Sequence, residues 1–314
     1  MTRVGAVDCG TNSIRLLIAD EDGEGGLTEV LRDMVIVRLG QGVNATGRFA
    51  PEAIERTRIA LERYVETMRS AGVQRVRMVA TSATRDAGNR DEFFAMTAEL
   101  LGRIVPGTVA EVISGDEEAR LSFRGAVGDL STSSRDGGGP FVVTDLGGGS
   151  TEIVMHDAAY SADVGCVRLT EHALNSDPPT DAELAEATSF VAERLAPAFA
   201  AVPVSEARTW VGVAGTLTTL SALNLGLPEY DSEKIHRSRI PFSDLKRICW
   251  ELIRMPREQR AALGPMHPGR VDVIGGGALV TLALADEFAR RAGIDELVVS
   301  ETDILDGIAL GLVN

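Results

Sequence analysis

The chain has 314 residues, and its 46 acidic and 31 basic side chains give a formal net charge of -15. A chain of this length exceeds the size at which one hydrophobic core usually keeps growing, so we expect two domains. The acidic balance argues against general nucleic-acid binding through a basic face, and three scattered cysteines without a CxxC pair argue against a disulfide framework or a structural zinc site.

The first part of the sequence alternates strand and helix patterns. It enters a strand directly, without the charged and then apolar organisation of a signal peptide, and no apolar run in the chain reaches transmembrane length. The predicted elements are, in order, strands at 4–8, 14–20 and 27–39, a helix that begins at Pro51 and stops at Gly72, a strand at 75–81, a helix at 91–104 and a strand at 109–113. This alternation predicts an α/β sheet with covering helices, and we expect a soluble, cytoplasmic protein with no membrane partner.

A helix and then a linker are predicted to separate the two domains. Ser114, followed three residues later by Glu117, is the capping-box pattern of a helix start. The stretch 125–139 is polar, rich in Gly and Ser, and without apolar periodicity, which favours a linker or a surface loop. We therefore expect one domain at 1–124 and a second at 125–314.

The second domain is predicted to repeat the plan of the first. Its predicted elements are strands at 141–146, 151–156 and 160–165, a helix at about 181–201, a strand at 209–215, helices around 216–224, 243–255 and 268–292, a strand at 296–300 and a final helix at 304–312. The final helix is expected to close the second domain.

Two Gly-rich turns stand at matching places in the two halves. VGAVDCGTNSIRLLIAD (4–20) aligns with FVVTDLGGGSTEIVMHD (141–157) at one offset of about 137 residues. The aligned pairs are Asp8 with Asp145, Gly10 with Gly147 and Ser13 with Ser150. Glycines free backbone N–H groups and hydroxyls add donors, which suits a turn that approaches a phosphate. Two such turns suggest two similar domains facing across a cleft, with two unrelated turns and structural Asp residues as the alternative.

Two carboxylates flank the second turn. Asp145 precedes it, and Glu152 follows two residues beyond Ser150 on a strand, where it would be half-buried unless it is paired or bound to a metal. This arrangement suits Mg²⁺, which prefers carboxylate oxygens together with water and substrate phosphate. A plain surface glutamate is the alternative for Glu152.

The pair Glu117 and Glu118 begins a helix directly after a strand. The capping box accounts for Glu117, which leaves Glu118 to point into a cleft and act as a base on water. Stabilisation of the helix start is the alternative for both. Arg85 follows another strand, at the kind of strand end where ligand loops lie, and is either a phosphate contact or a solvated arginine.

Two further Gly-rich segments fall in the second half. GVAGT (212–216) would lie at the ligand edge of that domain, and GGG (275–277) would let a helix pack closely on a ligand or a sheet. Other chemistries lack their markers, because no GxxxxGK[ST] or GxSxG motif occurs and the four histidines lack metal-ligand spacing.

Six motifs together resemble the exopolyphosphatase/guanosine pentaphosphate phosphatase (Ppx/GppA) family in its short, two-domain form. They are DCGTNSIRLL (8–17), ATSATRD (80–86), ISGDEEAR (113–120), TDLGGGSTEIV (144–154), GVAGTLTT (212–219) and SETDILDGIALG (300–311). They run in family order over essentially the whole chain. The resemblance implies an α/β fold with two ribonuclease-H-like domains of the actin/sugar-kinase superfamily, facing across a cleft.

The resemblance also implies a reaction and a set of roles. The reaction is hydrolytic release of the terminal phosphate from inorganic polyphosphate, or of the 5′-phosphate from guanosine pentaphosphate, assisted by Mg²⁺ or another divalent cation. By motif position, the implied roles are a catalytic base at Glu118 with Glu117 beside it, metal ligands at Asp145 and Glu152, and phosphate contacts at Asn12, Ser13, Arg85, Gly147, Gly148, Gly149 and Ser150. Asp116 departs mildly from the family pattern and adds negative charge without removing a required group.

Three alternative functions stay open at this point. Guanosine pentaphosphate is the alternative substrate for the same residues. A phosphotransferase or ATPase of the superfamily would need a nucleotide pocket, for which the two later Gly-rich segments are candidate walls. A noncatalytic polyphosphate- or alarmone-binding regulator is the third, and the presence of both Glu117 and Glu118 counts against it. The oligomeric state is also open, with a homodimer as one option.

Overall fold

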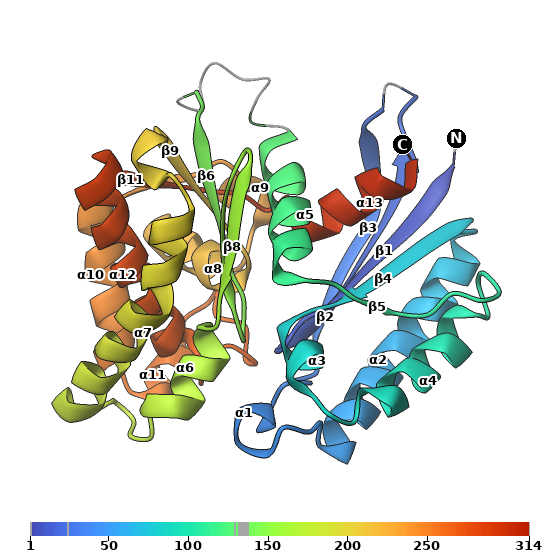
Figure 1. Cartoon of the computed structure of the whole chain (residues 1–314), viewed down its shortest axis with the longest axis horizontal. Coiled ribbons are helices and arrows are strands. Elements are labelled where there is room, and N and C mark those ends of the chain that lie inside the picture. Colours follow the sequence, from blue (N-terminus) through green and yellow to red (C-terminus); the bar gives the residue numbers. More distant parts are fainter. Residues whose placement is uncertain (1, 24, 129, 131–137, 314) are drawn as a thin grey trace. The chain divides into compact units, whose positions relative to one another are not determined.

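The computed structural model describes residues 2–23, 25–128, 130 and 138–313 (Figure 1). The predicted linker at 125–139 falls outside the described residues at 129 and 131–137. The chain divides into two compact units, unit 1 with Met1–Gly125 and Ile304–Asn314, and unit 2 with Ala126–Asp303. Within the described ranges, no helix combines the length and the apolar character needed to cross a membrane.

Unit 1 is built on one mixed sheet with the strand order β3-β2-β1-β4-β5. Its strands are β1 (Arg3–Cys9), β2 (Ser13–Glu21), β3 (Leu27–Ile36), β4 (Arg75–Ala80) and β5 (Glu111–Val112). The first three form an antiparallel meander, and β4 and β5 run parallel to β1. This is the order and direction expected of a ribonuclease-H-like sheet, the fold that the family resemblance implied.

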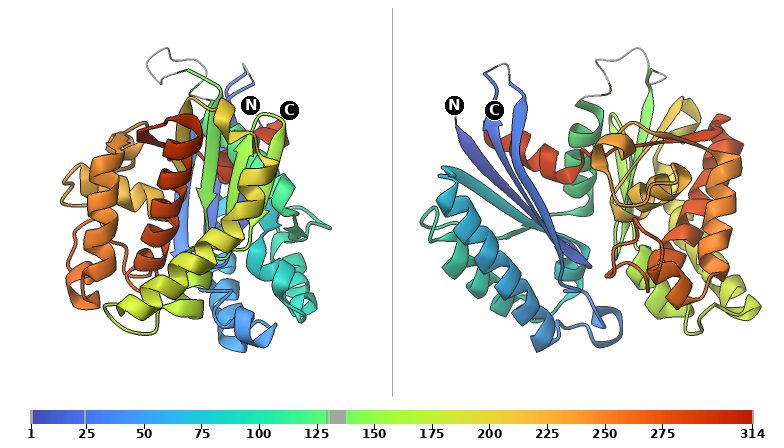
Figure 2. Two further views of the ribbon diagram at one scale, coloured as in Figure 1. Left: turned by 60° about the vertical axis from the view of Figure 1, so that its left-hand side comes forward. Right: turned by 180° about the vertical axis from the view of Figure 1, so that it is seen from behind.

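Helices cover both faces of this sheet (Figure 2). The helices of unit 1 are α1 (Val43–Thr46), α2 (Pro51–Ser70), α3 (Ser82–Asp86), α4 (Arg90–Leu101) and α13 (Ile304–Val313), and α5 (Gly115–Gly128) begins in it. Successive residues of a strand face opposite sides. Val7 and Cys9 therefore pack in the same buried cluster as α2 and α4, whereas Val4 and Ala6 pack with α13 on the other face.

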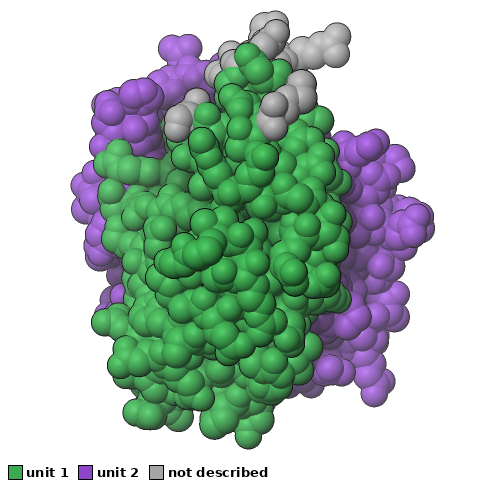
Figure 3. Space-filling view, turned by 90° about the vertical axis from the view of Figure 1, so that its right-hand side faces the viewer, with its two compact units in different colours: residues 1–125, 304–314 green, residues 126–303 purple. Residues whose placement is uncertain are grey.

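The place of α13 corrects the predicted domain assignment, which put this helix in the second domain. The helix belongs to unit 1 (Figure 3), where buried Ile304 and Ile308 pack against β1 residues. Asp306 accepts a hydrogen bond from Arg32 of β3 at 2.7 Å. Gly307 lets the helix approach α5, because a Cβ there would collide with the Leu121 carbonyl oxygen. The apolar pattern predicts a buried helix correctly, but it carries no information about which sheet buries it.

Unit 2 has a six-stranded sheet with the order β10-β11-β9-β6-β7-β8. Its strands are β6 (Phe141–Leu146), β7 (Thr151–Met155), β8 (Ala158–Ala162), β9 (Thr209–Val213), β10 (Arg239–Pro241) and β11 (Glu296–Val299). An antiparallel meander of β6, β7 and β8 is followed by the parallel neighbours β9 and β11. The five strands other than β10 repeat the order and directions found in unit 1, which confirms the predicted duplication.

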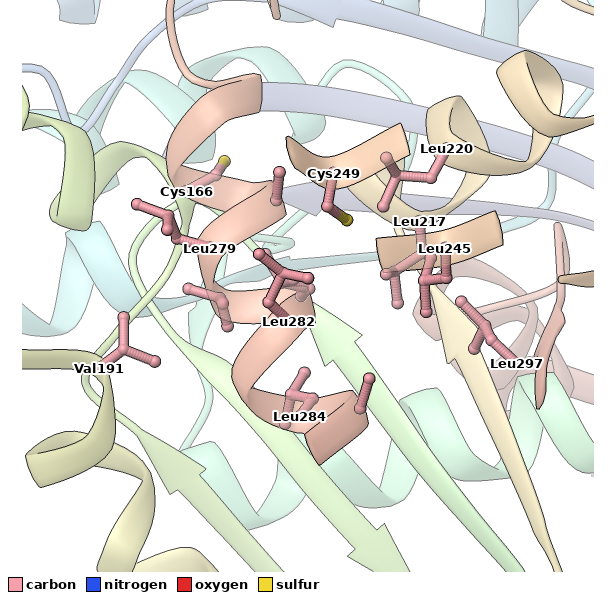
Figure 4. Close-up of a cluster of buried hydrophobic side chains, with 14 of the residues drawn as sticks. Cys166, Val191, Leu217, Leu220, Leu245, Cys249, Leu279, Leu282, Leu284 and Leu297 are labelled. Carbon is pink, nitrogen blue, oxygen red and sulfur yellow. The ribbon is translucent and has the colours of Figure 1, made fainter. Parts of the chain in front are cut away.

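The helices of unit 2 enclose the larger core. They are α6 (Cys166–Ala173), α7 (Asp181–Ala201), α8 (Gly215–Asn224), α9 (Ser232–Ile235), α10 (Phe242–Arg254), α11 (Arg257–Ala261) and α12 (Ile274–Ala292), with a 3₁₀ turn η1 at Val204–Glu206. Figure 4 shows Leu279, Leu282 and Leu284 of α12 among side chains from the neighbouring elements. The predicted helix at 268–292 begins only at Ile274, because 268–273 form turns.

The GGG segment at the start of α12 allows close helix packing, one of its two predicted roles. A Cβ on Gly276 would lie 2.5 Å from Thr170 Oγ1 of α6, and a Cβ on Gly277 would lie 2.6 Å from Thr216 Oγ1 of α8. Real Cβ atoms do not make contacts this short, so α12 needs glycine at both places to approach its neighbours.

The start of α7 provides a test of pH dependence. Thr180 and Glu183 form a complete capping box. The Thr180 backbone N–H is the strongest of several hydrogen bonds that lower the pKa of Glu183 to about 2, and the Asn175 and Ser176 N–H groups also donate to Glu183, at 2.8 Å each. Because the folded state lowers the pKa of Glu183, the ionised carboxylate stabilises the folded protein. This contribution is complete above the ordinary pKa of 4.5 and is lost as the pH falls toward about 2.

Glu183→Gln should therefore weaken hydrogen-exchange protection of the Asn175 and Ser176 amides at neutral pH, because the amide accepts these bonds less strongly than a carboxylate. The difference from the wild type should shrink as the pH approaches 2, where the wild-type carboxyl is itself protonated. Glu186→Gln, on the same helix, is the matched control and should leave these amides unchanged. Equal loss of protection at all pH values would show that the ionised Glu183 carboxylate is not what protects the Asn175 and Ser176 amides.

Candidate active site

The two Gly-rich turns have the same hydrogen-bonded geometry. In hairpin 1, formed by β1 and β2, the Gly10 N–H donates to the Ser13 carbonyl oxygen over 2.9 Å. In hairpin 2, formed by β6 and β7, the Gly147 N–H donates to the Ser150 carbonyl oxygen over 3.0 Å. The predicted repeat is therefore present at the level of individual hydrogen bonds.

Hairpin 1 has a partly buried ion pair across its strands. Asp8 lies directly opposite Arg15, and the Arg15 guanidinium donates to one Asp8 oxygen from Nη2 at 2.7 Å and from Nε at 3.1 Å. The predicted phosphate contacts Asn12 and Ser13 are half-buried at the turn. The Asn12 carbonyl accepts two backbone N–H groups from the segment that follows β3. The turn is thus held to a second part of unit 1, which fixes where its polar groups lie.

Hairpin 2 has two carboxylates in the equivalent places. Asp145 lies directly opposite Glu152, and the two residues are only 6% and 1% exposed. The Ser161 hydroxyl of β8 donates to Glu152 Oε1 at 2.6 Å. Like charges directly opposite on neighbouring strands repel, and burial increases the cost of keeping both ionised. A bound cation relieves this repulsion.

The donors of hairpin 2 fit a hard divalent ion. Mg²⁺ is commonly held by one or two carboxylates and completes its shell with water and substrate phosphate. Asp145 and Glu152 supply two such carboxylates on one face of the sheet. Among the described residues, no group of three or more His, Cys, Asp or Glu side chains could hold a metal ion. The predicted ligands Asp145 and Glu152 therefore offer two carboxylates to such an ion.

The turn 147–150 is fastened to the start of α6. The Gly147 and Gly148 carbonyl oxygens accept backbone N–H groups from the first residues of that helix, and Arg168 Nε donates to the Gly149 carbonyl oxygen at 2.7 Å. Gly165 permits this approach, because a Cβ there would lie 2.6 Å from the Gly147 carbonyl oxygen. The sequence reasoning missed Arg168 and Gly165. The only sequence signal for these two residues is a glycine followed by a basic residue at a helix start.

The predicted base and one predicted phosphate contact come together in unit 1. Glu118, in the first turn of α5, is 7% exposed, and its Oε2 accepts a hydrogen bond from Arg85 Nη1 at 2.7 Å. The same Arg85 nitrogen donates to the Ile113 carbonyl oxygen at 3.1 Å. The dipole at the N-terminus of α5 also favours the ionised carboxylate. Glu118 is thus a buried, oriented carboxylate, which suits a general base better than a flexible surface residue does.

Glu117 is oriented differently from its neighbour. Its side chain is 45% exposed and pairs with Arg77 of β4 at 2.6 Å, and its backbone N–H donates to the Ser114 hydroxyl at 3.2 Å. The predicted capping role of Ser114 is thus present. The partners of Glu117 are those of a helix start and of an ion pair with a strand, whereas Glu118 is held by Arg85.

The turn between β9 and α8 is strained. Ala214 has a φ of 73°, a left-handed conformation that costs a residue with a Cβ about 1–3 kcal/mol and is found most often at functional sites. The Arg270 guanidinium packs on Gly215, where any Cβ would collide with it, and its Nη1 donates to Thr219 at 3.3 Å. The GVAGT segment therefore lies beside a cation that the sequence reasoning did not include.

The predicted site residues form two groups, one in each unit. In unit 1, Glu118 contacts Arg85, and Asn12 and Ser13 lie at the turn of hairpin 1. In unit 2, Asp145 and Glu152 are cross-strand partners beside the turn 147–150. Each group combines the polar or charged side chains that phosphate chemistry requires.

Comparisons with known proteins agree over the full chain. A model of the Ppx/GppA phosphatase family matches residues 17–311. A protein of Mycobacterium tuberculosis named Exopolyphosphatase 2 is 62% identical over 99% of this chain and 99% of its own length. A crystal structure of an exopolyphosphatase-like protein is 42% identical, with a TM-score of 0.92 over 99% of this chain and 97% of that chain. The crystal structure of an Aquifex aeolicus Ppx/GppA family member is 31% identical, with a TM-score of 0.77 over 99% and 97%.

Proposed function

The chain belongs to the Ppx/GppA phosphatase family, and we propose that it is an exopolyphosphatase, a hydrolase that cleaves the terminal phosphoanhydride bond of inorganic polyphosphate and releases orthophosphate. The observation that carries this proposal is the 62% identity, over 99% of both chains, to a protein named Exopolyphosphatase 2. The geometry of the candidate residues supports the proposal independently, since they include a buried carboxylate held by an arginine, a Gly-rich turn and a cross-strand carboxylate pair.

In unit 1, the proposed base is Glu118 and the proposed cationic phosphate contact is Arg85. Glu118 orients a water molecule and takes its proton as the water attacks the terminal phosphorus in line with the leaving oxygen. Arg85 keeps this carboxylate in position through the 2.7 Å hydrogen bond and presents a fork of donors suited to phosphate oxygens. Asn12 and Ser13 supply neutral donors at the turn of hairpin 1. The charge that spreads over the phosphoryl oxygens is stabilised by such fixed groups.

In unit 2, the proposed phosphate-binding and metal-binding groups are the turn 147–150 and the carboxylate pair. Asp145 and Glu152 would hold Mg²⁺ or another divalent ion, which supplies positive charge to offset the phosphate oxygens of the substrate. The turn 147–150, fastened to α6 by the contacts described above, presents Gly147, Gly148, Gly149 and Ser150 toward phosphate. A protein with a net charge of -15 needs such local positive charge to bind a polyanion.

Metal-dependent phosphate release tests the proposed function. Short polyphosphate, long polyphosphate and guanosine pentaphosphate are supplied in parallel, each with MgCl₂ and with EDTA, and kcat/KM is compared. We expect polyphosphate to be the better substrate and EDTA to abolish release. A higher kcat/KM for guanosine pentaphosphate would replace the proposed substrate with the nucleotide, and release that requires a second nucleotide substrate would indicate a phosphotransferase.

Asp145→Asn and Glu152→Gln should each raise the Mg²⁺ concentration needed for half-maximal phosphate release by at least about 10-fold, because even outer groups around a metal affect its affinity by 10–100-fold. Asp157→Asn is the matched control. It removes a carboxylate from the exposed β7–β8 turn of the same meander and should leave the Mg²⁺ dependence unchanged. An unaltered Mg²⁺ titration in both site variants would remove the carboxylate pair from the metal site.

A further inference from the structure

We infer that Ser161 is a positioning residue of the metal site, whose hydroxyl holds the Glu152 carboxylate in one orientation for the divalent ion. The inference rests on the metal site of the proposed function and deepens it. None of the six sequence motifs includes Ser161, which lies on β8, outside both Gly-rich turns.

The first step is the register of the meander in unit 2. Asp145 of β6 lies directly opposite Glu152 of β7, which in turn lies directly opposite Ser161 of β8. The next residues along β7 and β8, Ile153 and Ala162, belong to the hydrophobic core of unit 2. Because successive residues of a strand point to opposite faces, the three polar residues share the face that is turned away from this core.

The second step is the contact between the last two members of this row. Ser161 Oγ donates to Glu152 Oε1 at 2.6 Å, a length typical of a charge-assisted bond from a hydroxyl to a carboxylate. Glu152 is buried, so bulk water does not compete for this bond. The two oxygens of a carboxylate are joined rigidly, so a donor that fixes one of them also fixes the direction of the other. Ser161 thus restricts the rotation of the whole group.

The third step is the anchoring of Ser161 itself. The Thr151 hydroxyl at the start of β7 donates to the Val164 carbonyl oxygen just beyond β8, at 2.6 Å, and this bond ties the end of β8 to β7. The corresponding place in unit 1, opposite Arg15 on β3, holds Met34. The fold of the meander therefore does not itself require a hydroxyl at this place.

The consequence concerns the affinity for the ion. Without the Ser161 hydroxyl, the Glu152 carboxylate would adopt further orientations, and binding of an ion would have to restrict them at a cost in affinity. The loss of a group that orients a metal ligand typically lowers metal affinity by about 10–100-fold.

Binding of Mn²⁺ to the full chain tests this inference without turnover. Free Mn²⁺ is measured by its EPR signal, and Ser161→Ala should raise the Kd for Mn²⁺ by about 10–100-fold. Ser161→Thr keeps the hydroxyl and should have a Kd close to that of the wild type. Thr209→Val is the matched control, because it removes another hydroxyl hydrogen bond of the same sheet, at 3.0 Å to the Gly138 carbonyl oxygen, and should leave the Kd unchanged. An unchanged Kd in folded Ser161→Ala, or an equal increase in Thr209→Val, would overturn the inference.

Two further measurements separate positioning from other roles. Ser161→Cys replaces the hydroxyl with a weaker donor and should raise the Kd, so a wild-type Kd in this variant would overturn the inference even if Ser161→Ala fails to fold. At saturating Mg²⁺, Ser161→Ala should recover most of the wild-type kcat for phosphate release, whereas a kcat that stays low would show that Ser161 does not act through ion binding.

The outcomes for Ser161 and for the proposed function are distinguishable. A chain that binds Mn²⁺ in the expected pattern but releases no phosphate from polyphosphate would refute the proposed substrate and leave the role of Ser161 standing. Active wild-type enzyme together with an unaltered Kd for Mn²⁺ in Ser161→Ala would refute the role of Ser161 and leave the proposed function standing.

Discussion

Glu118→Gln should lower phosphate release from polyphosphate by about 10²–10⁴-fold, the usual contribution of a general base. Glutamine has nearly the same shape, and its amide oxygen can still accept the hydrogen bond that Arg85 donates to Glu118 at 2.7 Å. It cannot take a proton from water. Binding of polyphosphate should therefore survive, and kcat should fall with little change in KM.

Neighbouring acidic residues on α5 provide the controls for this prediction. Asp116 is an exposed residue paired with Arg120 at 2.8 Å, so Asp116→Asn should keep kcat close to that of the wild type. Glu117→Gln tests whether Glu117 and Glu118 have different roles. Because Glu117 pairs with Arg77 and not with Arg85, its effect should be much smaller than that of Glu118→Gln. Full activity of Glu118→Gln, measured with folded protein and a polyphosphate-binding assay, would remove Glu118 as the base.

Gly307→Ala should destabilise unit 1 by about 2–3 kcal/mol, the upper part of the range for overpacking a well-packed interior. The added Cβ would collide with the carbonyl oxygen of Leu121, which is backbone within α5 and cannot rotate away as a side chain can. Either α13 or α5 must move, and Glu118 lies one turn before the contact. We therefore expect a lower denaturant midpoint together with reduced phosphate release.

Gly311→Ala is the matched control for that substitution. It lies on the same helix one turn later, is exposed, and its Cβ would meet only Arg124 Nη1 at 4.0 Å. Here alanine should be neutral or stabilising by up to about 1 kcal/mol, because glycine is the poorer helix former. If both variants show the same change in urea midpoint, the close approach of α13 to α5 does not limit the stability of unit 1.

Local patterns in the sequence predicted most of the elements and the duplication. Short apolar runs on either side of the first Gly-rich turn identified β1 and β2, and Pro51 marked the first residue of α2. The matching Asp, Gly and Ser positions of the two turns were sufficient to predict two similar sheets. These signals are local, because they arise from the sterics and burial of residues that are close together in the sequence.

Long-range pairings could not be predicted in the same way. Nothing in the composition of α13 indicates that it packs against β1, some 300 residues earlier in the sequence. The Arg85–Glu118 pair joins two segments through the fold of unit 1. From the sequence alone, a solvated arginine was the usual interpretation of a lone Arg85. Arg15 was visible as a residue of a strand, but its charge acquires meaning only when the register places it opposite Asp8.

The place of α13 has a consequence for how the protein is made. Unit 1 contains both the first and the last residues of the chain, so the ribosome must translate all of unit 2 before the helix that covers one face of the first sheet is available. At about 5–20 residues per second, roughly 15–60 seconds pass between the synthesis of β1 and that of α13, which lies about 300 residues later. During that interval Val4, Ala6 and Leu17 lack the cover that they have in the finished molecule. Unit 1 is thus completed only after unit 2 has been synthesised, and nascent chains that stop before Ile304 should be clients of chaperones and proteases even though unit 2 is entire.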